Sequence, residues 1–280
     1  MGDKFSPNTY WRNRVAVDAT IGVVGHRSLG IEYNEFIYRR RVDVLNQVLV
    51  RYGLDPDRDA ILDIGCGTGY YSRYWRSKGF GQYLGIDLSD ATVDRLKDEM
   101  PEYAFISADI ADLPDDAIKR KHFTVITVFD VFYHIVDDER LSQALENIRV
   151  RLSADGVLII FDQLAKDDYV LRKHVKFRSE LSYLELLKQA GLEVMEREKL
   201  FCLLVPPLYG RRVLDIPIGG IYKVIGIFMK AVPVLGRFLG KRMYELDNAL
   251  RRRNVDIPNN EVFIVRHRQV DSDTTRSDCA

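Results

Sequence analysis

Three glycines at alternate positions, Gly65, Gly67 and Gly69, come directly after a short apolar segment that contains a carboxylate, Ile61-Leu-Asp-Ile64. A helical pattern begins at the next residue, so the sequence predicts a buried strand, a sharp turn and a helix N-terminus. Because glycine has no Cβ, such a turn reaches positive φ values and lets a ligand lie against the backbone. Asp63 stands in the strand, where its burial is costly unless a partner offsets the charge. A ligand with positive charge is the chemistry that fits best.

The glycine spacing distinguishes this turn from a dinucleotide-binding turn. A dinucleotide site uses G-x-G-x-x-G and leaves the helix N-terminus to hold a pyrophosphate, whereas the spacing here is G-x-G-x-G, after an acid that would repel phosphate. The segment Asp63–Gly69, which includes Cys66, resembles the first motif (D/E-x-G-x-G-x-G) of the class I S-adenosylmethionine-dependent methyltransferases. The resemblance implies that this turn binds S-adenosyl-L-methionine, which carries an amino group and a sulfonium.

A second carboxylate ends the next predicted strand, Tyr83–Asp87. A carboxylate at this place is the acceptor that the two hydroxyls of a nucleoside ribose need, so we interpret Asp87 and its neighbour Leu88 as part of the cofactor site. A simple turn before a helix is the alternative. The family's third motif implies that Asp109 accepts a hydrogen bond from the adenine amino group and that the backbone amide of Ile110 meets a ring nitrogen.

The end of a fourth apolar strand, Phe123–Asp130, carries the candidates for contact with the reacting groups. In the family that the chain resembles, this strand end faces the methionine part of the cofactor and the substrate, which implies contacts from Phe129 and Asp130. His134 follows, and because an imidazole accepts a proton near neutral pH it is the candidate general base. A histidine that only packs against the strand is the alternative. Tyr133, beside it, is a candidate for substrate binding.

Two further candidates for substrate contact lie outside the predicted core. His26 belongs to a turn-rich N-terminal segment that the same resemblance favours as a cover over the cofactor, with Tyr10, Arg12, His26 or Arg27 facing the pocket. An arm that packs its aromatic side chains on the domain is the alternative. Tyr209 belongs to the insertion that follows the core and is a candidate to enter the pocket. No spacing of histidines, cysteines or carboxylates predicts a metal site.

The charge balance and the cysteines restrict the class of protein. Forty-one Lys and Arg residues equal 41 Asp and Glu residues in a chain of 280, so no global field indicates a nucleic-acid binder. The N-P-P-[YF] signature of nucleic-acid and glutamine N-methyltransferases is absent, because the fourth strand ends in Phe129-Asp-Val-Phe132. Three cysteines without close pairing, and a start without the apolar core of a signal peptide, predict a cytoplasmic protein.

The elements that must position these residues form an α/β fold. We predict a Rossmann-like seven-stranded sheet with helices on both faces and an antiparallel last strand, which binds its cofactor at the carboxyl ends of the first two strands. The expected parts are an N-terminal arm and cover helix (1–53), the S-adenosylmethionine-binding core (54–205), a mostly helical cap or insertion (206–260), the last strand (261–270) and a disordered tail (271–280).

Local patterns add detail to two of these parts. A 3.6-residue period predicts a helix from Ile31 to Tyr52 that Gly53 ends, and its triplet Arg39–Arg41 is interpreted as a solvated face. Residues 162–178 have mixed charge and no period, so we expect them to be irregular and, by resemblance, to carry substrate contacts.

The insertion combines many apolar side chains with an excess of basic ones. Residues 201–253 hold ten basic and three acidic side chains, and Lys223 and Lys230 stand seven apart, hence on one face of a helix. A cap over the substrate pocket or a homodimer contact is one interpretation. Docking on an anionic membrane surface, to reach a lipid-like substrate, is the other.

The motifs therefore predict an S-adenosylmethionine-dependent methyltransferase that moves a methyl group to an oxygen or nitrogen atom of a small molecule. Two alternatives stay open. An NAD-dependent oxidoreductase shares the strand, the turn and the acid after the second strand, although its glycine spacing differs. A non-catalytic, methyltransferase-like partner protein would share the fold alone.

Overall fold

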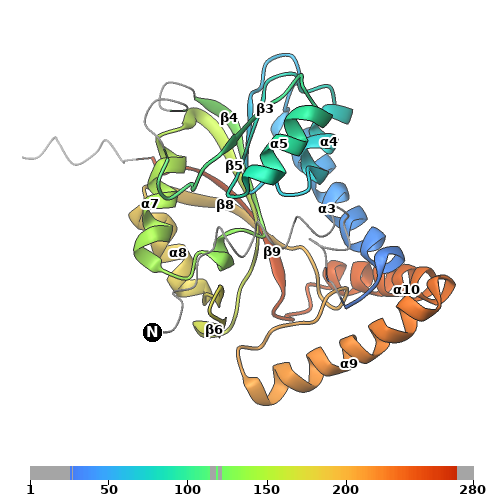
Figure 1. Ribbon diagram of the computed structural model, residues 1–280. Helices are drawn as coiled ribbons and strands as arrows, with labels where there is room; N and C mark the ends of the chain where they lie inside the picture. The colour runs from blue at the N-terminus through green and yellow to red at the C-terminus, as the bar shows by residue number, and fades with distance from the viewer. Residues whose placement is uncertain (1–25, 27, 114–117, 119–121, 270–280) are drawn as a thin grey trace, which may run out of the picture.

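The computed structural model describes residues 26, 28–113, 118 and 122–269, so the predicted arm up to residue 25 and the predicted tail after 270 lie outside the described residues. A mixed sheet of seven strands runs through the described chain in the order β3-β2-β1-β4-β5-β9-β8 (Figure 1). The strands are β1 (Ile61–Ile64), β2 (Tyr83–Asp87), β3 (Ala104–Ser107), β4 (Phe123–Phe129), β5 (Leu152–Gln163), β8 (Leu192–Lys199) and β9 (Asn260–His267).

The strand directions confirm the predicted fold class. The strands from β1 to β5 pair in parallel, whereas β9 lies antiparallel between β5 and β8. The order of the strands reverses between β1 and β4, and in sheets of this kind a ligand crevice opens at such a point, outside the carboxyl ends of the strands.

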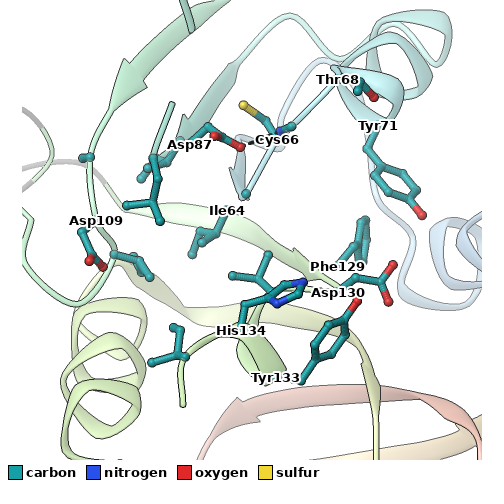
Figure 2. A pocket seen from close by; sticks show the side chains of 18 of the residues that line it. Ile64, Cys66, Thr68, Tyr71, Asp87, Asp109, Phe129, Asp130, Tyr133 and His134 are labelled. Atoms are coloured by element: carbon teal, nitrogen blue, oxygen red, sulfur yellow. Dashed lines mark hydrogen bonds between the residues drawn. The ribbon is translucent and has the colours of Figure 1, made fainter. Parts of the chain in front are cut away.

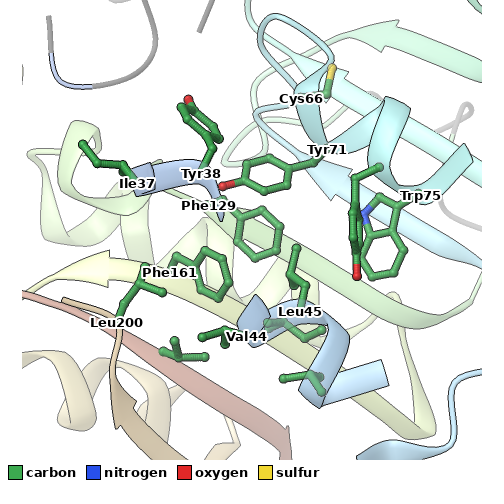
Figure 3. Packing of buried hydrophobic residues seen from close by; sticks show 14 of the residues in the cluster. Ile37, Tyr38, Val44, Leu45, Cys66, Tyr71, Trp75, Phe129, Phe161 and Leu200 are labelled. Atoms are coloured by element: carbon green, nitrogen blue, oxygen red, sulfur yellow. The ribbon is translucent and has the colours of Figure 1, made fainter. Parts of the chain in front are cut away.

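Helices cover both faces of the sheet. On one face lie α3 (Ile31–Tyr52), α4 (Tyr70–Ser77) and α5 (Asp90–Glu99), and on the other α7 (Asp138–Arg149) and α8 (Glu180–Gln189). The side chains of β4 alternate between these two cores, since Val125 and Phe129 face the first and Ile126 and Val128 the second. Figure 3 shows the first core, in which Phe129 stacks on Phe161 with ring centroids 4.2 Å apart.

Helix α3 has the predicted bounds, but the interpretation of its arginines is wrong for two of the three. Gly53 ends the helix in the left-handed conformation, with φ 59°. Arg40 and Arg41 are only 5% and 7% exposed, because α3 has a neighbour on each side: the first core and the helical insertion. Arg39 remains exposed.

The segment that we expected to be irregular contains a two-stranded antiparallel ribbon, β6 (Tyr169–Arg172) and β7 (Val175–Phe177). Its inner side chains form a small separate core with the loop that follows β8, through Val175, Phe177 and Leu208. A four-residue strand with three exposed side chains has no strong alternating pattern, so its sequence did not reveal it.

The insertion before the last strand is helical. Helices α9 (Arg212–Ala231) and α10 (Pro233–Arg252) form a hairpin in which α10 packs along α3 and α9 lies at the edge of the molecule (Figure 1). None of the described helices is long and apolar enough to cross a membrane.

Candidate active site

A cavity of about 440 Å³ opens at the carboxyl ends of β1, β2 and β4, where the strand order reverses. Its walls come from α3, the glycine turn, the end of β2, the loop after β3 and the segment after β4 (Figure 2). The short 3₁₀ helix η1 (Phe132–His134) carries two of the predicted site residues into this wall. The fold therefore gathers residues that are up to about a hundred positions apart in the chain.

The three glycines of the turn have positive φ values of 75°, 52° and 79°, but their structural roles differ. A Cβ on Gly65 would lie 2.4 Å from Cγ2 of Val131, and one on Gly69 would lie 2.4 Å from Cδ2 of Leu96. Both glycines thus allow close packing within the protein. A Cβ on Gly67 would meet nothing closer than a backbone oxygen at 3.7 Å, and Gly67 lines the cavity. This position leaves room for a ligand.

Asp87 is held at the cavity wall by two backbone donors. The N–H of Gly67 donates to Oδ2 and the N–H of Ser89 donates to Oδ1, each over 2.9 Å. Burial raises the pKa of Asp87, while these donors oppose the rise. The carboxylate is therefore fixed in place with its acceptor oxygens beside the turn, and Leu88 lines the same wall.

Asp63 lies beneath the turn rather than on the cavity wall. It is 1% exposed, and its two oxygens accept hydrogen bonds from Oγ1 of Thr127 and from the hydroxyl of Tyr83, both over 2.7 Å. Burial raises the pKa of Asp63 to about 6 against the effect of these donors. The partner that its burial requires is thus found within the protein, and the structure does not bring this carboxylate to the cavity.

At the far side of the cavity from Phe129, Asp109 and Ile110 line the wall as the family order implies. Oδ1 of Asp109 accepts the N–H of Ala111 over 2.9 Å, and Oδ2 pairs with Arg140 over 2.6 Å. The carboxylate is oriented by these two donors.

The end of β4 and the segment after it bring Phe129, Asp130, Tyr133 and His134 to the cavity (Figure 2). Asp130 has a φ of 60°, a conformation that non-glycine residues rarely adopt and that concentrates at functional sites. Nδ1 of His134 lies 3.0 Å from the carbonyl oxygen of His174, so this nitrogen carries a proton. In the neutral ring the lone pair therefore belongs to Nε2.

Our interpretation of the sequence missed the contribution of α3. Arg41 and Tyr38 line the cavity next to Tyr70 and Tyr71 of α4. Arg41 pairs with Asp130 over 2.5 Å and, although burial opposes it, this carboxylate raises the pKa of the guanidinium. A signal was present, because Arg41 lies three and four residues from apolar positions of the inward face of the same helix.

Two candidates for substrate contact do not line the cavity. His26 lies before α3, where its backbone N–H donates to Oδ1 of Asn34 over 2.8 Å and burial lowers the pKa of its ring to about 4. Tyr209 lies in the loop before α9, with its backbone N–H donating to Oδ1 of Asp215 over 2.7 Å. Tyr10, Arg12 and Arg27 lie outside the described residues.

Residues 33–197 match the family model of a methyltransferase domain. A malonyl-[acyl-carrier protein] O-methyltransferase of Hamiltonella defensa subsp. Acyrthosiphon pisum (strain 5AT) is 42% identical over 60 residues, which are 21% of this chain and 23% of that protein. The matched segment thus spans about a quarter of the length of this curated relative.

Solved structures share the fold at low sequence identity. A SAM-dependent methyltransferase from Leishmania major superposes with a TM-score of 0.57 at 13% identity, over 95% of this chain and 87% of that one. The O-methyltransferase from a trans-AT PKS multienzyme of Brevibacillus brevis, solved with S-adenosyl-L-homocysteine, superposes with a TM-score of 0.52 at 16% identity, over 80% and 71% of the two chains.

The family model covers more than half of the chain, from α3 to β8, and the sheet has the strand order and the antiparallel strand expected of the class I fold. This protein therefore belongs to the family of S-adenosyl-L-methionine-dependent methyltransferases with the class I fold.

Proposed function

We propose that the protein transfers a methyl group to an oxygen or nitrogen atom of a small molecule. The observation that carries the proposal is that one cavity joins the Cβ-free turn and the oriented Asp87 carboxylate to His134 and Tyr133. When bound, S-adenosyl-L-methionine supplies a methyl group activated by its sulfonium. The protein's own task is then to position the acceptor and to exclude water.

The residues around the cavity fit this cofactor. Asp87 and Leu88 would hold the ribose, and Asp109 and Ile110 the adenine, while the Gly65–Gly67 turn with Cys66 and Phe129 would border the methionine part. The open space at Gly67 supports this assignment, because a side chain there would occupy the cavity. The match to a methyltransferase domain makes an NAD-dependent oxidoreductase the weaker alternative.

His134 is the group that we assign to the acceptor's proton. Its Nδ1 proton is donated to the His174 carbonyl, so Nε2 of the neutral ring accepts a proton from a hydroxyl or ammonium group. The tyrosines of α3 and α4 form an aromatic wall of the same cavity, which suits an acceptor with a flat or apolar part. The relatives that are named O-methyltransferases favour an oxygen acceptor.

The test is methyl transfer from isotopically labelled S-adenosyl-L-methionine to the small molecules of a cell extract, with His134→Gln as the variant. Loss of a general base lowers turnover by about 10²-fold or more, so we expect that loss with a cofactor affinity within about twofold of the unchanged protein. His122→Gln, an exposed histidine at the opposite end of β4, is the matched control. Unchanged turnover in His134→Gln would remove His134 from the mechanism, and no labelled product from any extract would remove the proposed function.

We also propose that the protein works in a reducing compartment. The thiols of Cys66 and Cys202 are free and buried, which supports a reducing compartment such as the cytoplasm. A homodimer stays an open alternative for the helical insertion.

A further inference from the structure

Helix α9 presents an apolar surface to solvent. Eight large hydrophobic side chains along it are between 40% and 85% exposed, among them Val213 at 85%, Ile216 at 69%, Ile227 at 60% and Phe228 at 61%. Together with Val224 these residues are here called the outer face. Folded proteins rarely leave a contiguous apolar surface of this kind without a function.

The orientation of the outer face is fixed because the opposite side of α9 packs against the rest of the protein. The hydroxyl of Tyr222 donates to the carbonyl of Leu203 over 2.6 Å, and Met229 is 1% exposed. At Gly226 the helix approaches the loop before α3 so closely that a Cβ would lie 1.8 Å from the carbonyl oxygen of Ser28. Tyr222, Gly226 and Met229 share one side at helical spacing, so the exposed outer face points away from the rest of the described chain. Figure 1 shows α9 at the edge of the molecule.

Positive charge borders the outer face. Between residues 211 and 241 the chain has six basic residues and one acidic residue, Asp215. Lys223 and Lys230 are exposed and lie seven residues apart, on one side of the outer face. Lysine side chains at such a border keep their charge in the polar layer while their methylene groups lie along apolar surface.

We propose that the outer face of α9 docks the protein on an anionic lipid bilayer, with the helix lying in the plane of the interface. Apolar residues on one side and lysines at the border are the arrangement that binds such a surface, because burial and charge then act together. A second copy of the chain fits less well, since an antiparallel two-fold contact of α9 with its copy would place the lysines of both helices along the same border.

Docking through α9 would also bring the cavity close to the bilayer. Gly30, at the start of α3, lies against Lys230, since a Cβ there would be 3.4 Å from Cγ of that lysine. About two to three turns further along, the same helix places Tyr38 and Arg41 in the cavity wall. The docking itself does not depend on methyl transfer, so it is tested separately.

The experiment is sedimentation of the full chain with vesicles of phosphatidylcholine that contain about one-fifth phosphatidylserine. We expect binding that is weaker on phosphatidylcholine alone and that falls with added salt. The double variant Ile227→Asn, Phe228→Asn should bind at least about tenfold more weakly. Leu181→Asn, an 81% exposed position on α8, is the matched control and should bind as the unchanged protein does.

A second pair of variants tests the charges without altering the apolar surface. Lys223→Gln with Lys230→Gln should lower the affinity for anionic vesicles and flatten its salt dependence, whereas Lys188→Gln on α8 should change neither. Absence of binding to anionic vesicles would overturn the proposal, as would equal losses in the variants and their controls. A dimer in solution that Ile227→Asn, Phe228→Asn dissociates, with no vesicle binding, would assign the face to a second copy.

Discussion

At the scale of single residues, the carboxylates of the site are oriented by hydrogen bonds and ion pairs from the protein itself. Asp87 is oriented by the Gly67 and Ser89 amides, and Asp109 by Ala111 and Arg140. Because these groups are oriented before a ligand binds, the entropic cost of ordering them on binding is lower.

The glycines of the turn give a paired prediction. Alanine at Gly69 meets Leu96 at 2.4 Å in a left-handed backbone, so Gly69→Ala should lower the free energy of unfolding by about 2–4 kcal/mol. Gly67→Ala has the backbone cost of about 1–2 kcal/mol without a clash. Its methyl group takes up cavity space, so its main effect should be a loss of cofactor affinity of about tenfold or more. Urea unfolding measures the loss of stability in both variants, and calorimetric titration measures their cofactor affinity. If Gly67→Ala lost no more affinity than Gly69→Ala in proportion to its loss of stability, the different roles of the two glycines would be contradicted.

Much of the cofactor side of the site was predictable at this scale, because each residue follows a strand in a fixed order. The acceptor side was less so. Arg41 belongs to a charged triplet, which we interpreted as a solvated face although its spacing places it near the apolar side of the helix. Because α3 is buried on two sides, Arg41 instead pairs with Asp130. His26 and Tyr209 were chosen from segments without a periodic pattern, and neither residue lines the cavity.

At the scale of elements, helices with clear periods and glycine ends were predicted closely, as α3 shows, and the ribbon β6–β7 was not. The packing of the insertion also could not be predicted, since it depends on polar contacts between distant segments. The chief contact is Asp247 of α10, which is fully buried and whose Oδ1 accepts the N–H groups of Cys202, Leu203 and Leu204 over 2.6–2.8 Å.

Removal of that carboxylate should loosen the insertion. Asp247→Ala leaves three backbone donors without their acceptor in a buried place, so we expect a loss of about 3–5 kcal/mol in the free energy of unfolding. Glu245→Ala, an exposed carboxylate on the same helix that pairs with Arg242, should cost less than about 1 kcal/mol. Denaturant unfolding compares the two, and a loss below about 1 kcal/mol for Asp247→Ala would show that this contact does not hold the insertion.

At the scale of the whole molecule, two buried carboxylates make stability depend on pH. Burial raises the pKa of Asp162, at the end of β5, to about 7, with the Gln163 amide opposing the rise and the charge of Asp130 adding to it. The pKa of Asp63 is raised to about 6. In the unfolded chain both ionise near pH 4.

The sign of the effect follows from proton binding. Between about pH 4 and 7 the native protein keeps a proton on Asp162 that the unfolded chain has released, so the protein loses stability as pH rises. Asp162→Asn removes this contribution. Relative to the unchanged protein, its free energy of unfolding should therefore be about 2–3 kcal/mol higher at pH 8 than at pH 5. Urea unfolding at both pH values measures this difference, and identical pH profiles would contradict the raised pKa of Asp162 in the folded protein.

The central claim is that S-adenosyl-L-methionine binds in the cavity between the glycine turn and Asp87. Isothermal titration of the protein with this cofactor, beside Asp87→Ala and the exposed control Asp94→Ala on α5, tests it most directly. The expected result is saturable binding that Asp87→Ala weakens by about tenfold or more and Asp94→Ala leaves unchanged. Binding of NAD without binding of S-adenosyl-L-methionine, or equal affinity in Asp87→Ala, would contradict the account.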